Sequence, residues 1–171
     1  MEQSTATNRL FDIAAKIKLL ILDVDGVMTD GTLWFGDDGA EYKGFNVKDG
    51  HGIKELIRNG IDVAVITGRR SSAVDRRMVE LGIVHYYAGQ ADKMAAYDEL
   101  LLSLRLQSNQ VAYIGDDEPD APVMQRCSLP VAVADAHASA KLVAGLITDA
   151  RGGNGAVREV CDLLIDATRT R

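Results

Sequence analysis

The sequence predicts an α/β fold built on one doubly wound, mostly parallel sheet, with a β-hairpin inserted after the first strand. Short apolar runs, typical of strands buried on both faces, alternate with segments whose apolar residues recur at helical spacing. This alternation favours helices layered on a largely parallel sheet. At 171 residues, the chain has the length of a single domain.

Five short apolar runs are the predicted strands of the sheet. They cover residues 18–22, 61–66, 84–87, 111–114 and 129–133. Segment 29–47 interrupts the alternation, because two aromatic-containing runs there flank Gly36-Asp37-Asp38-Gly39. An Asp-Gly step between two strand-like runs predicts a β-hairpin.

Apolar residues at helical spacing fill the stretches between the predicted strands. The first predicted helix ends at Gly60, because glycine terminates helices well. The second opens with Ser72 and Asp75 in capping-box spacing and ends at Gly82. The third carries a wide apolar stripe over residues 94–104.

The composition of the sequence also predicts the structure of the two ends of the chain. The polar residues 1–10 predict a flexible N-terminal lead, which leaves residues 11–171 as the single domain. The last predicted helix covers residues 156–167 of a C-terminal tail, 151–171. It follows the glycine-rich segment 151–155, which we expect to be flexible.

The charge and the cysteines exclude several classes of protein. With 19 basic and 25 acidic residues, the net charge of -6 provides no general basic field for nucleic acid or an anionic membrane. No stretch approaches the roughly 18 apolar residues that a membrane span needs. Cys127 and Cys161 are too few for a disulfide framework, and the polar N-terminus lacks an apolar signal core. These features predict a cytoplasmic location.

Side chains that could take part in catalysis or bind a metal follow four of the predicted strands. They are Asp23 and Asp25, then Thr67, Gly68 and Arg69, then Lys93, and finally Asp116, Asp117 and Asp120. The carboxyl ends of parallel strands share one edge of a sheet, so we expect these groups to converge. Two like charges 4 Å apart cost about 4 kcal/mol at an effective dielectric constant of 20, so the acidic cluster needs a cation. Carboxylate oxygens without His or Cys favour Mg²⁺.

This set of residues predicts phosphoryl transfer. An ionised carboxylate can attack phosphorus and form an aspartyl phosphate. A second carboxyl group two residues away could protonate the leaving oxygen and later accept a proton from water. Thr67 could donate a hydrogen bond to the transferring group, and Lys93 could place a positive charge beside it. The expected activity is that of a Mg²⁺-dependent phosphomonoesterase.

The same residues carry a family resemblance. Asp23-x-Asp25-Gly-Val, Ile66-Thr67-Gly68-Arg69, Lys93 and Gly115-Asp116-Asp117-x-x-Asp120 resemble, in this order, the four motifs of haloacid dehalogenase-like phosphatases. Segments 23–31, 45–50, 131–137 and 155–161 resemble the branch without a cap domain, which includes phosphatases of 3-deoxy-D-manno-octulosonate 8-phosphate. The resemblance covers about residues 12–165. One departure is Asn154, where relatives carry Arg or Lys.

The resemblance assigns roles to individual residues. It implies that Asp23 is the nucleophile and a Mg²⁺ ligand, and that Asp25 is the acid/base, with its backbone carbonyl on the metal. Asp116 would bind Mg²⁺ directly, while Asp117 and Asp120 would support the metal through water or orient Lys93. It also implies that Thr67 and Lys93 hold the phosphoryl group. Gly68 is a further predicted substrate-binding residue, and the guanidinium groups of Arg69 and Arg158 could meet the carboxylate of the sugar acid bidentately.

The resemblance also implies an assembly and a pathway. The substrate would be a small anionic sugar phosphate of lipopolysaccharide precursor synthesis. Four copies would form a homotetramer through hairpins like residues 29–47, and a neighbouring subunit would help cover each active site.

Three alternatives stay open from the sequence. A nonulosonate 9-phosphate presents similar carboxylate and phosphate groups, so it is an alternative substrate. A phosphoacceptor signalling domain also uses clustered Asp, Thr, Lys and Mg²⁺, but there the lysine follows the last strand, whereas here an acidic cluster follows Lys93. A non-catalytic oligomerisation module is the third alternative, and the intact Asp25 and Thr67 argue against it.

Overall fold

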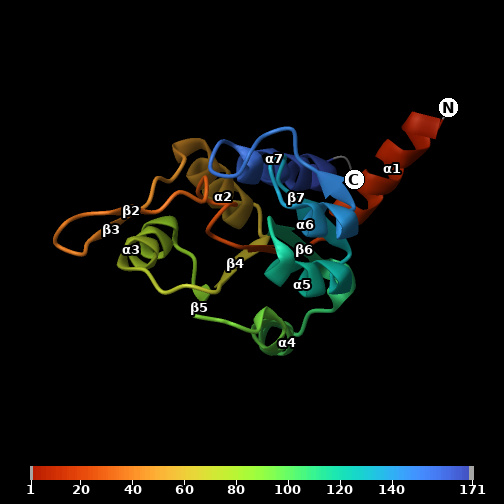
Figure 1. The fold of residues 1–171 in the computed structure, drawn as a ribbon. Helices are drawn as coiled ribbons and strands as arrows, with labels where there is room; N and C mark the ends of the chain where they lie inside the picture. The colour runs from red at the N-terminus through yellow and green to blue at the C-terminus, as the bar shows by residue number, and fades with distance from the viewer. Residues whose placement is uncertain (1, 170–171) are drawn as a thin grey trace.

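Six parallel strands form one sheet in the order β5-β4-β1-β6-β7-β8 in the computed structural model, which describes residues 2–169. The strands are β1 (Leu19–Leu22), β4 (Asp62–Thr67), β5 (His85–Ala88), β6 (Val111–Gly115), β7 (Leu129–Ala132) and β8 (Leu146–Ile147). A separate hairpin pairs β2 (Trp34–Phe35) with β3 (Glu41–Tyr42) in antiparallel fashion. The predicted fold class is confirmed, with the hairpin projecting from one end of the molecule (Figure 1).

Helices cover both faces of the sheet (Figure 1). They are α1 (Glu2–Ala14), α2 (Val47–Arg58), α3 (Ser72–Leu81), α4 (Lys93–Leu104), α5 (Ala121–Arg126), α6 (Ala138–Val143) and α7 (Ala156–Arg169). On one face α7 packs against α1 and α2, and α2 also contacts α3. On the other face α5 contacts both α4 and α6. Single 3₁₀ turns at Ser108–Gln110 and Glu118–Asp120 flank β6.

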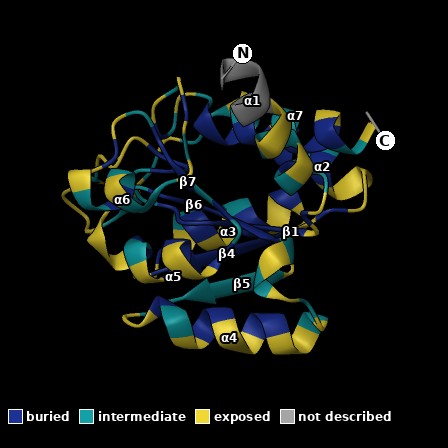
Figure 2. Ribbon diagram, turned by 90° about the vertical axis from the view of Figure 1, so that its right-hand side faces the viewer, coloured by how far each residue is buried: buried dark blue, intermediate teal, exposed yellow. Residues whose placement is uncertain are grey.

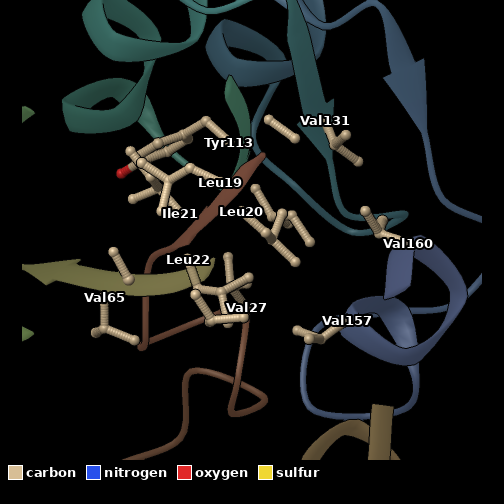
Figure 3. Close-up of a cluster of buried hydrophobic side chains, with 14 of the residues drawn as sticks. Leu19, Leu20, Ile21, Leu22, Val27, Val65, Tyr113, Val131, Val157 and Val160 are labelled. Carbon is tan, nitrogen blue, oxygen red and sulfur yellow. The ribbon is translucent and has the colours of Figure 1, made fainter. Parts of the chain in front are cut away.

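The central strand β1 explains why its sequence is a continuous apolar run. It lies between β4 and β6, and all four of its residues are fully buried. Leu19 and Ile21 lie on the side of Tyr113, while Leu20 and Leu22 face the other layer, which Val157 and Val160 of α7 complete (Figure 3). Because helices cover both faces, neither set of side chains meets water. Figure 2 shows the contrast with the edge strand β5, whose residues are all partly exposed.

Most sequence-predicted elements are present, and the differences have simple causes. Each of the five predicted strands lies within two residues of an observed one. Helix α3 starts one residue earlier than its capping-box spacing predicts: Ser71 is the N-cap, and its side chain makes no capping hydrogen bond. Strand β8 and helices α5 and α6 were not predicted, because elements of two to six residues carry too little periodicity.

The N-terminal segment differs from the expected flexible lead. Residues 2–10 belong to helix α1, which continues to Ala14. Leu10, Phe11 and Ile13 pack against the core, and Ala14 is fully buried. The helix contacts α7, so tertiary packing of its last turns stabilises a segment whose first residues are polar.

The glycine-rich segment 151–155 is held in place rather than free. The backbone N–H of Gly152 donates to Asp135 Oδ1 over 3.0 Å, and that of Gly153 donates to the carbonyl of Val27 over 2.9 Å. A Cβ atom on Gly152 would lie 1.7 Å from the carbonyl oxygen of Gly26. The tail therefore packs directly onto the loop that follows β1.

The state of the two cysteines and the character of the helices bear on two further expectations from the sequence. Cys127 and Cys161 are free and buried, and burial raises the pKa of the Cys127 thiol to about 12, so that this thiol is unreactive at neutral pH. Among residues 2–169, no helix has both the length and the apolar character to span a bilayer.

Replacing Gly152 by alanine tests the contact between the tail and the loop after β1. The added methyl group overlaps backbone rather than a movable side chain, and such overpacking costs about 1–3 kcal/mol or more. For a chain of this length, this corresponds to a fall in Tm of at least about 2 °C. Calorimetry measures the change, with Gly44→Ala as the control, because nothing lies within 4 Å of a Cβ atom there. Equal Tm values for the two variants would contradict the packing argument.

Candidate active site

The candidate site lies at the carboxyl edge of the sheet, where the loops after β1 and β6 meet. The chain builds the sheet outward from β1 to β4 and β5, then returns to place β6 on the other side of β1. Ligands of open α/β sheets bind beside such a reversal of strand order. A cavity of about 310 Å³ opens there. Every side chain predicted for the site lines it except Arg158.

Lys93 joins the loops through two short contacts. Its ammonium lies 2.9 Å from Asp23 Oδ1 and 2.7 Å from Asp120 Oδ1, and its side chain is only 5% exposed. Asp23 follows β1, Lys93 is the first residue of α4, and Asp120 ends the 3₁₀ turn after β6. One ammonium group therefore fixes three segments that are distant in the sequence.

Both oxygens of Asp120 already accept hydrogen bonds. Besides Lys93, the hydroxyl of Tyr113 donates to Oδ1 over 2.6 Å. The backbone N–H groups of Asp116 and Asp117 donate to Oδ2 over 3.0 and 3.2 Å. A buried carboxylate with this many donors holds its loop rigidly. This geometry agrees with the expectation that Asp120 orients Lys93.

The electrostatics of the cavity indicate an excess of negative charge. Burial raises the pKa of Asp23 to about 6, although Lys93 opposes the shift. Burial, together with the charges of Asp23 and Asp120, raises the pKa of Asp116 to about 8. Burial alone would lower the pKa of Lys93, but the same two carboxylates outweigh it and raise that pKa. One ammonium group does not neutralise three acids, so a further cation would stabilise the site.

The donor set fits a hard divalent cation. One carboxylate oxygen from each of Asp23, Asp116 and Asp120 lies within 4.8 Å of the others. Since Asp120 is already saturated with hydrogen-bond donors, Asp23 and Asp116 are the carboxylates available to an ion. Gly26 makes their approach possible: it has a φ of +90°, and a Cβ atom there would lie 2.1 Å from Asp116 Oδ2. Oxygen ligands of this kind suit Mg²⁺.

Asp117 lies apart from these carboxylates. Its side chain is 59% exposed, and its Oδ1 accepts a hydrogen bond from the backbone N–H of Glu118 over 2.7 Å. It lines the cavity but does not belong to the acidic cluster. Any contribution of its side chain to a metal site would be indirect, as the sequence analysis allows.

The end of β4 and the turn after it line another part of the cavity. Thr67 is the buried last residue of that strand, and Gly68 and Arg69 follow it on the exposed rim. The Arg69 guanidinium donates from Nη2 to Glu41 Oε2 over 2.9 Å, and its Nε lies 3.7 Å from Asp25 Oδ2. The predicted convergence of Thr67 with Asp23, Asp25 and Lys93 is therefore observed.

Arg158 does not reach this cavity, which corrects its predicted contact with the substrate within one chain. It lies in the first turn of α7, and its backbone N–H donates to the buried Asp49 of α2. Its guanidinium donates from Nε to Asp162 over 2.8 Å and lines a separate hollow with His51. The packing of α7 on α2 turns the side chain away from the edge of the sheet where the strands end.

Three residues of the site or its surroundings were missed by the sequence analysis. In the sequence, Tyr113 looks like another apolar residue of a buried strand. The fold shows that its hydroxyl donates a hydrogen bond to Asp120. Glu41 and Lys43 flank an exposed tyrosine of the hairpin; Lys43 contacts Asp25, and Glu41 contacts Arg69. The alternation of charged residues with Tyr42 is a signal that could have placed them together on one side of the strand.

Asn154 has a local role in the structure. Its side-chain amide donates to the carbonyl of Gly152 over 2.9 Å and so closes the turn of the tail. Within the described residues, no histidine belongs to a group with metal-binding geometry.

Comparisons with known proteins agree with this geometry. The profile of haloacid dehalogenase-like hydrolases matches residues 82–160. A 3-deoxy-D-manno-octulosonate 8-phosphate phosphatase of Yersinia pestis is 57% identical over 152 residues, which are 89% of this chain and 81% of that protein. A crystal structure of the Yersinia pestis phosphatase superposes with a TM-score of 0.92 at 54% identity, covering 94% of this chain and 86% of the other.

A second solved structure carries ligands. It is the 3-deoxy-D-manno-octulosonate 8-phosphate phosphatase of Moraxella catarrhalis in complex with a magnesium ion, a phosphate ion and a KDO molecule. It superposes with a TM-score of 0.93 at 42% identity and covers 95% of this chain and 94% of its own. Identity of this extent over nearly full-length relatives establishes that the chain belongs to the haloacid dehalogenase-like hydrolase family.

Proposed function

We propose that the chain is a Mg²⁺-dependent phosphatase that hydrolyses 3-deoxy-D-manno-octulosonate 8-phosphate to the free sugar acid and phosphate. The observation that carries this proposal is the convergence of Asp23, Asp116 and Lys93 in a cavity that also contains Thr67. The identity of the substrate is supported by the relatives at 50–57% identity that bear this name. It is also supported by the related structure that holds magnesium, phosphate and the sugar.

The side chains divide the reaction between them. Mg²⁺, held by Asp23 and Asp116 and by the backbone carbonyl of Asp25, would neutralise charge on the phosphate. Lys93 fixes one oxygen of Asp23, which leaves the other to attack phosphorus while the bond to the sugar oxygen breaks. Asp25 donates a proton to that leaving oxygen and then takes one from the water that hydrolyses the aspartyl phosphate. The hydroxyl of Thr67 and the ammonium of Lys93 stabilise the phosphoryl oxygens throughout.

A cytoplasmic location and a role in lipopolysaccharide precursor synthesis belong to the same proposal. The two free, buried cysteines are in keeping with a reducing compartment. Arg69 on the rim of the cavity is the residue proposed to meet the carboxylate of the sugar acid.

Steady-state kinetics on a panel of phosphate esters tests the activity. We expect kcat/KM to be highest for 3-deoxy-D-manno-octulosonate 8-phosphate and at least tenfold lower for neutral sugar phosphates. Asp23→Asn should reduce turnover by several orders of magnitude, because it removes the nucleophile but preserves the shape of the side chain. Near-normal turnover of this variant would contradict the covalent route.

The same panel separates the alternatives. A preference for a nonulosonate 9-phosphate would change the substrate but keep the reaction. Slow release of a radiolabelled phosphate that stays on Asp23 would instead favour a phosphoacceptor domain. No turnover of any ester with Mg²⁺ present would favour an oligomerisation module.

Metal binding should change the dependence of stability on pH. In the metal-free protein the pKa of Asp116 is about 8 in the folded state, against 3.8 as the ordinary value. The folded protein thus keeps a proton that the unfolded chain releases, so this contribution to stability is lost as pH rises from about 4 to 8. We expect Mg²⁺ to raise Tm more at pH 8 than at pH 5, where protons compete for the carboxylates.

Two variants make this prediction specific. Asp116→Asn should abolish both the effect of Mg²⁺ on Tm and the activity. At pH 8 it should also raise the Tm of the metal-free protein by a few degrees, because an amide avoids both the burial of a charge and the repulsion from Asp23 and Asp120. The control Asp62→Asn changes an exposed residue at the opposite end of β4. An unchanged response to Mg²⁺ in Asp116→Asn would exclude Asp116 as a ligand.

The proposal extends to a homotetramer whose contacts involve the hairpin and in which a neighbouring subunit helps cover each cavity. Trp34, Phe35 and Tyr42 are 64%, 66% and 59% exposed, an unusual concentration of bare aromatic surface on one hairpin. We expect sedimentation analysis to give four copies for the unaltered protein and fewer for Trp34→Ser/Phe35→Ser. Leu102→Ser on α4, which is 81% exposed, is the control and should leave the assembly intact. A monomeric unaltered protein would refute this part.

A further inference from the structure

Four charged side chains form a closed network at the mouth of the cavity. The ammonium of Lys43 contacts Asp25 Oδ1 and lies 3.7 Å from Glu41 Oε1. The guanidinium of Arg69 closes the circuit, with Nη2 2.9 Å from Glu41 Oε2 and Nε 3.7 Å from Asp25 Oδ2. Each oxygen of Asp25 therefore faces a different cation, and Glu41 links the two cations.

The hairpin and the residue directly after it contribute two members of this network, Glu41 and Lys43. Glu41 belongs to β3 and Lys43 follows it directly, so both charged residues lie on one side of the strand while Tyr42 points to solvent at 59% exposure. The Lys43 side chain has no exposed surface at all. A lysine is almost never fully buried unless a carboxylate pairs with it, so the position of Lys43 depends on Asp25 and Glu41.

Asp25 needs such partners, because its own loop does not fix its carboxyl group. Its side chain is 24% exposed, whereas that of Asp23 is 11% exposed and contacts Lys93. A partly solvated carboxyl group can rotate, and a proton donor must keep within hydrogen-bond reach of the leaving oxygen. The two cations restrict that rotation from both sides.

We propose that Lys43 is a positioning residue that holds the carboxyl group of Asp25 toward the leaving oxygen of the substrate, with Glu41 and Arg69 as its supports. This inference rests on the proposed function, because it takes Asp25 as the general acid. The hairpin is then part of the catalytic apparatus as well as an exposed surface.

The leaving group of the substrate distinguishes this role from others. An alkoxide leaves poorly and needs a proton, whereas p-nitrophenolate leaves without one. The value of kcat/KM reports the steps up to departure of the leaving group and excludes the later hydrolysis of the aspartyl phosphate. A misplaced Asp25 should therefore lower kcat/KM for alkyl phosphates and spare the aryl phosphate.

The experiment measures kcat/KM of Lys43→Met with three esters. They are 3-deoxy-D-manno-octulosonate 8-phosphate, a neutral sugar phosphate with a primary phosphoester, and p-nitrophenyl phosphate. We expect about 10²-fold losses with both sugar phosphates, the scale of a 1 Å displacement at a reacting centre, and less than threefold with the aryl ester. Lys43→Arg should recover much of the loss, because it restores a cation beside Asp25.

Lys48→Met is the matched control, since it removes the same charge from an exposed position on α2 near the hairpin. It should leave all three values unchanged. Thermal unfolding of each variant shows whether the fold is retained.

Each other pattern of results overturns the inference. A loss confined to the acidic sugar phosphate would make Lys43 a ligand of the substrate carboxylate. Equal losses of kcat/KM with all three esters would indicate that Lys43 has only a structural role. Unchanged kcat/KM values would indicate that Lys43 has no role in the reaction. If the unaltered protein does not hydrolyse the acidic sugar phosphate, the proposed function fails, while the comparison of the neutral alkyl ester with the aryl ester still decides the role of Lys43.

Discussion

The ammonium of Lys93, shared between Asp23 and Asp120, is the interaction on which the rest of the site depends. It lies where α4 begins and connects the loop after β1 with the 3₁₀ turn after β6. Removing one partner from a buried ion pair leaves an uncompensated charge, which costs far more than the pair contributes. The requirement for a cation at this point therefore fixes the relative positions of loops that the sheet alone brings only into the same neighbourhood.

Glycines allow the loops to come this close. Gly26 leaves the space that the carboxylate of Asp116 occupies, and a Cβ atom on Gly115 would lie 2.5 Å from that of Asp120. Gly152 packs against the carbonyl of Gly26, so the tail supports the loop that carries Asp23. At each position a methyl group would push apart the groups whose proximity makes the chemistry possible.

Function and stability conflict in this cavity. Burial and mutual repulsion raise the pKa values of Asp23 and Asp116, so the folded protein gains from protonating groups that the proposed mechanism needs ionised. A divalent cation resolves the conflict by stabilising the charged forms. The network of the hairpin places two cations, Lys43 and Arg69, beside Asp25 at the mouth of the same cavity.

The sequence by itself determined the fold class, the central strands and the polar residues at their carboxyl ends, because apolar periodicity and residue type are local properties. It also placed Asp23, Thr67, Lys93 and Asp116 in one site, since parallel strands share an edge. Only the tertiary structure decided which charges pair. It turned Arg158 toward Asp162, engaged both oxygens of Asp120, and brought Lys43 from the hairpin to Asp25. Such pairings depend on how helices and loops pack across long sequence separations, and no periodicity within a short segment records them.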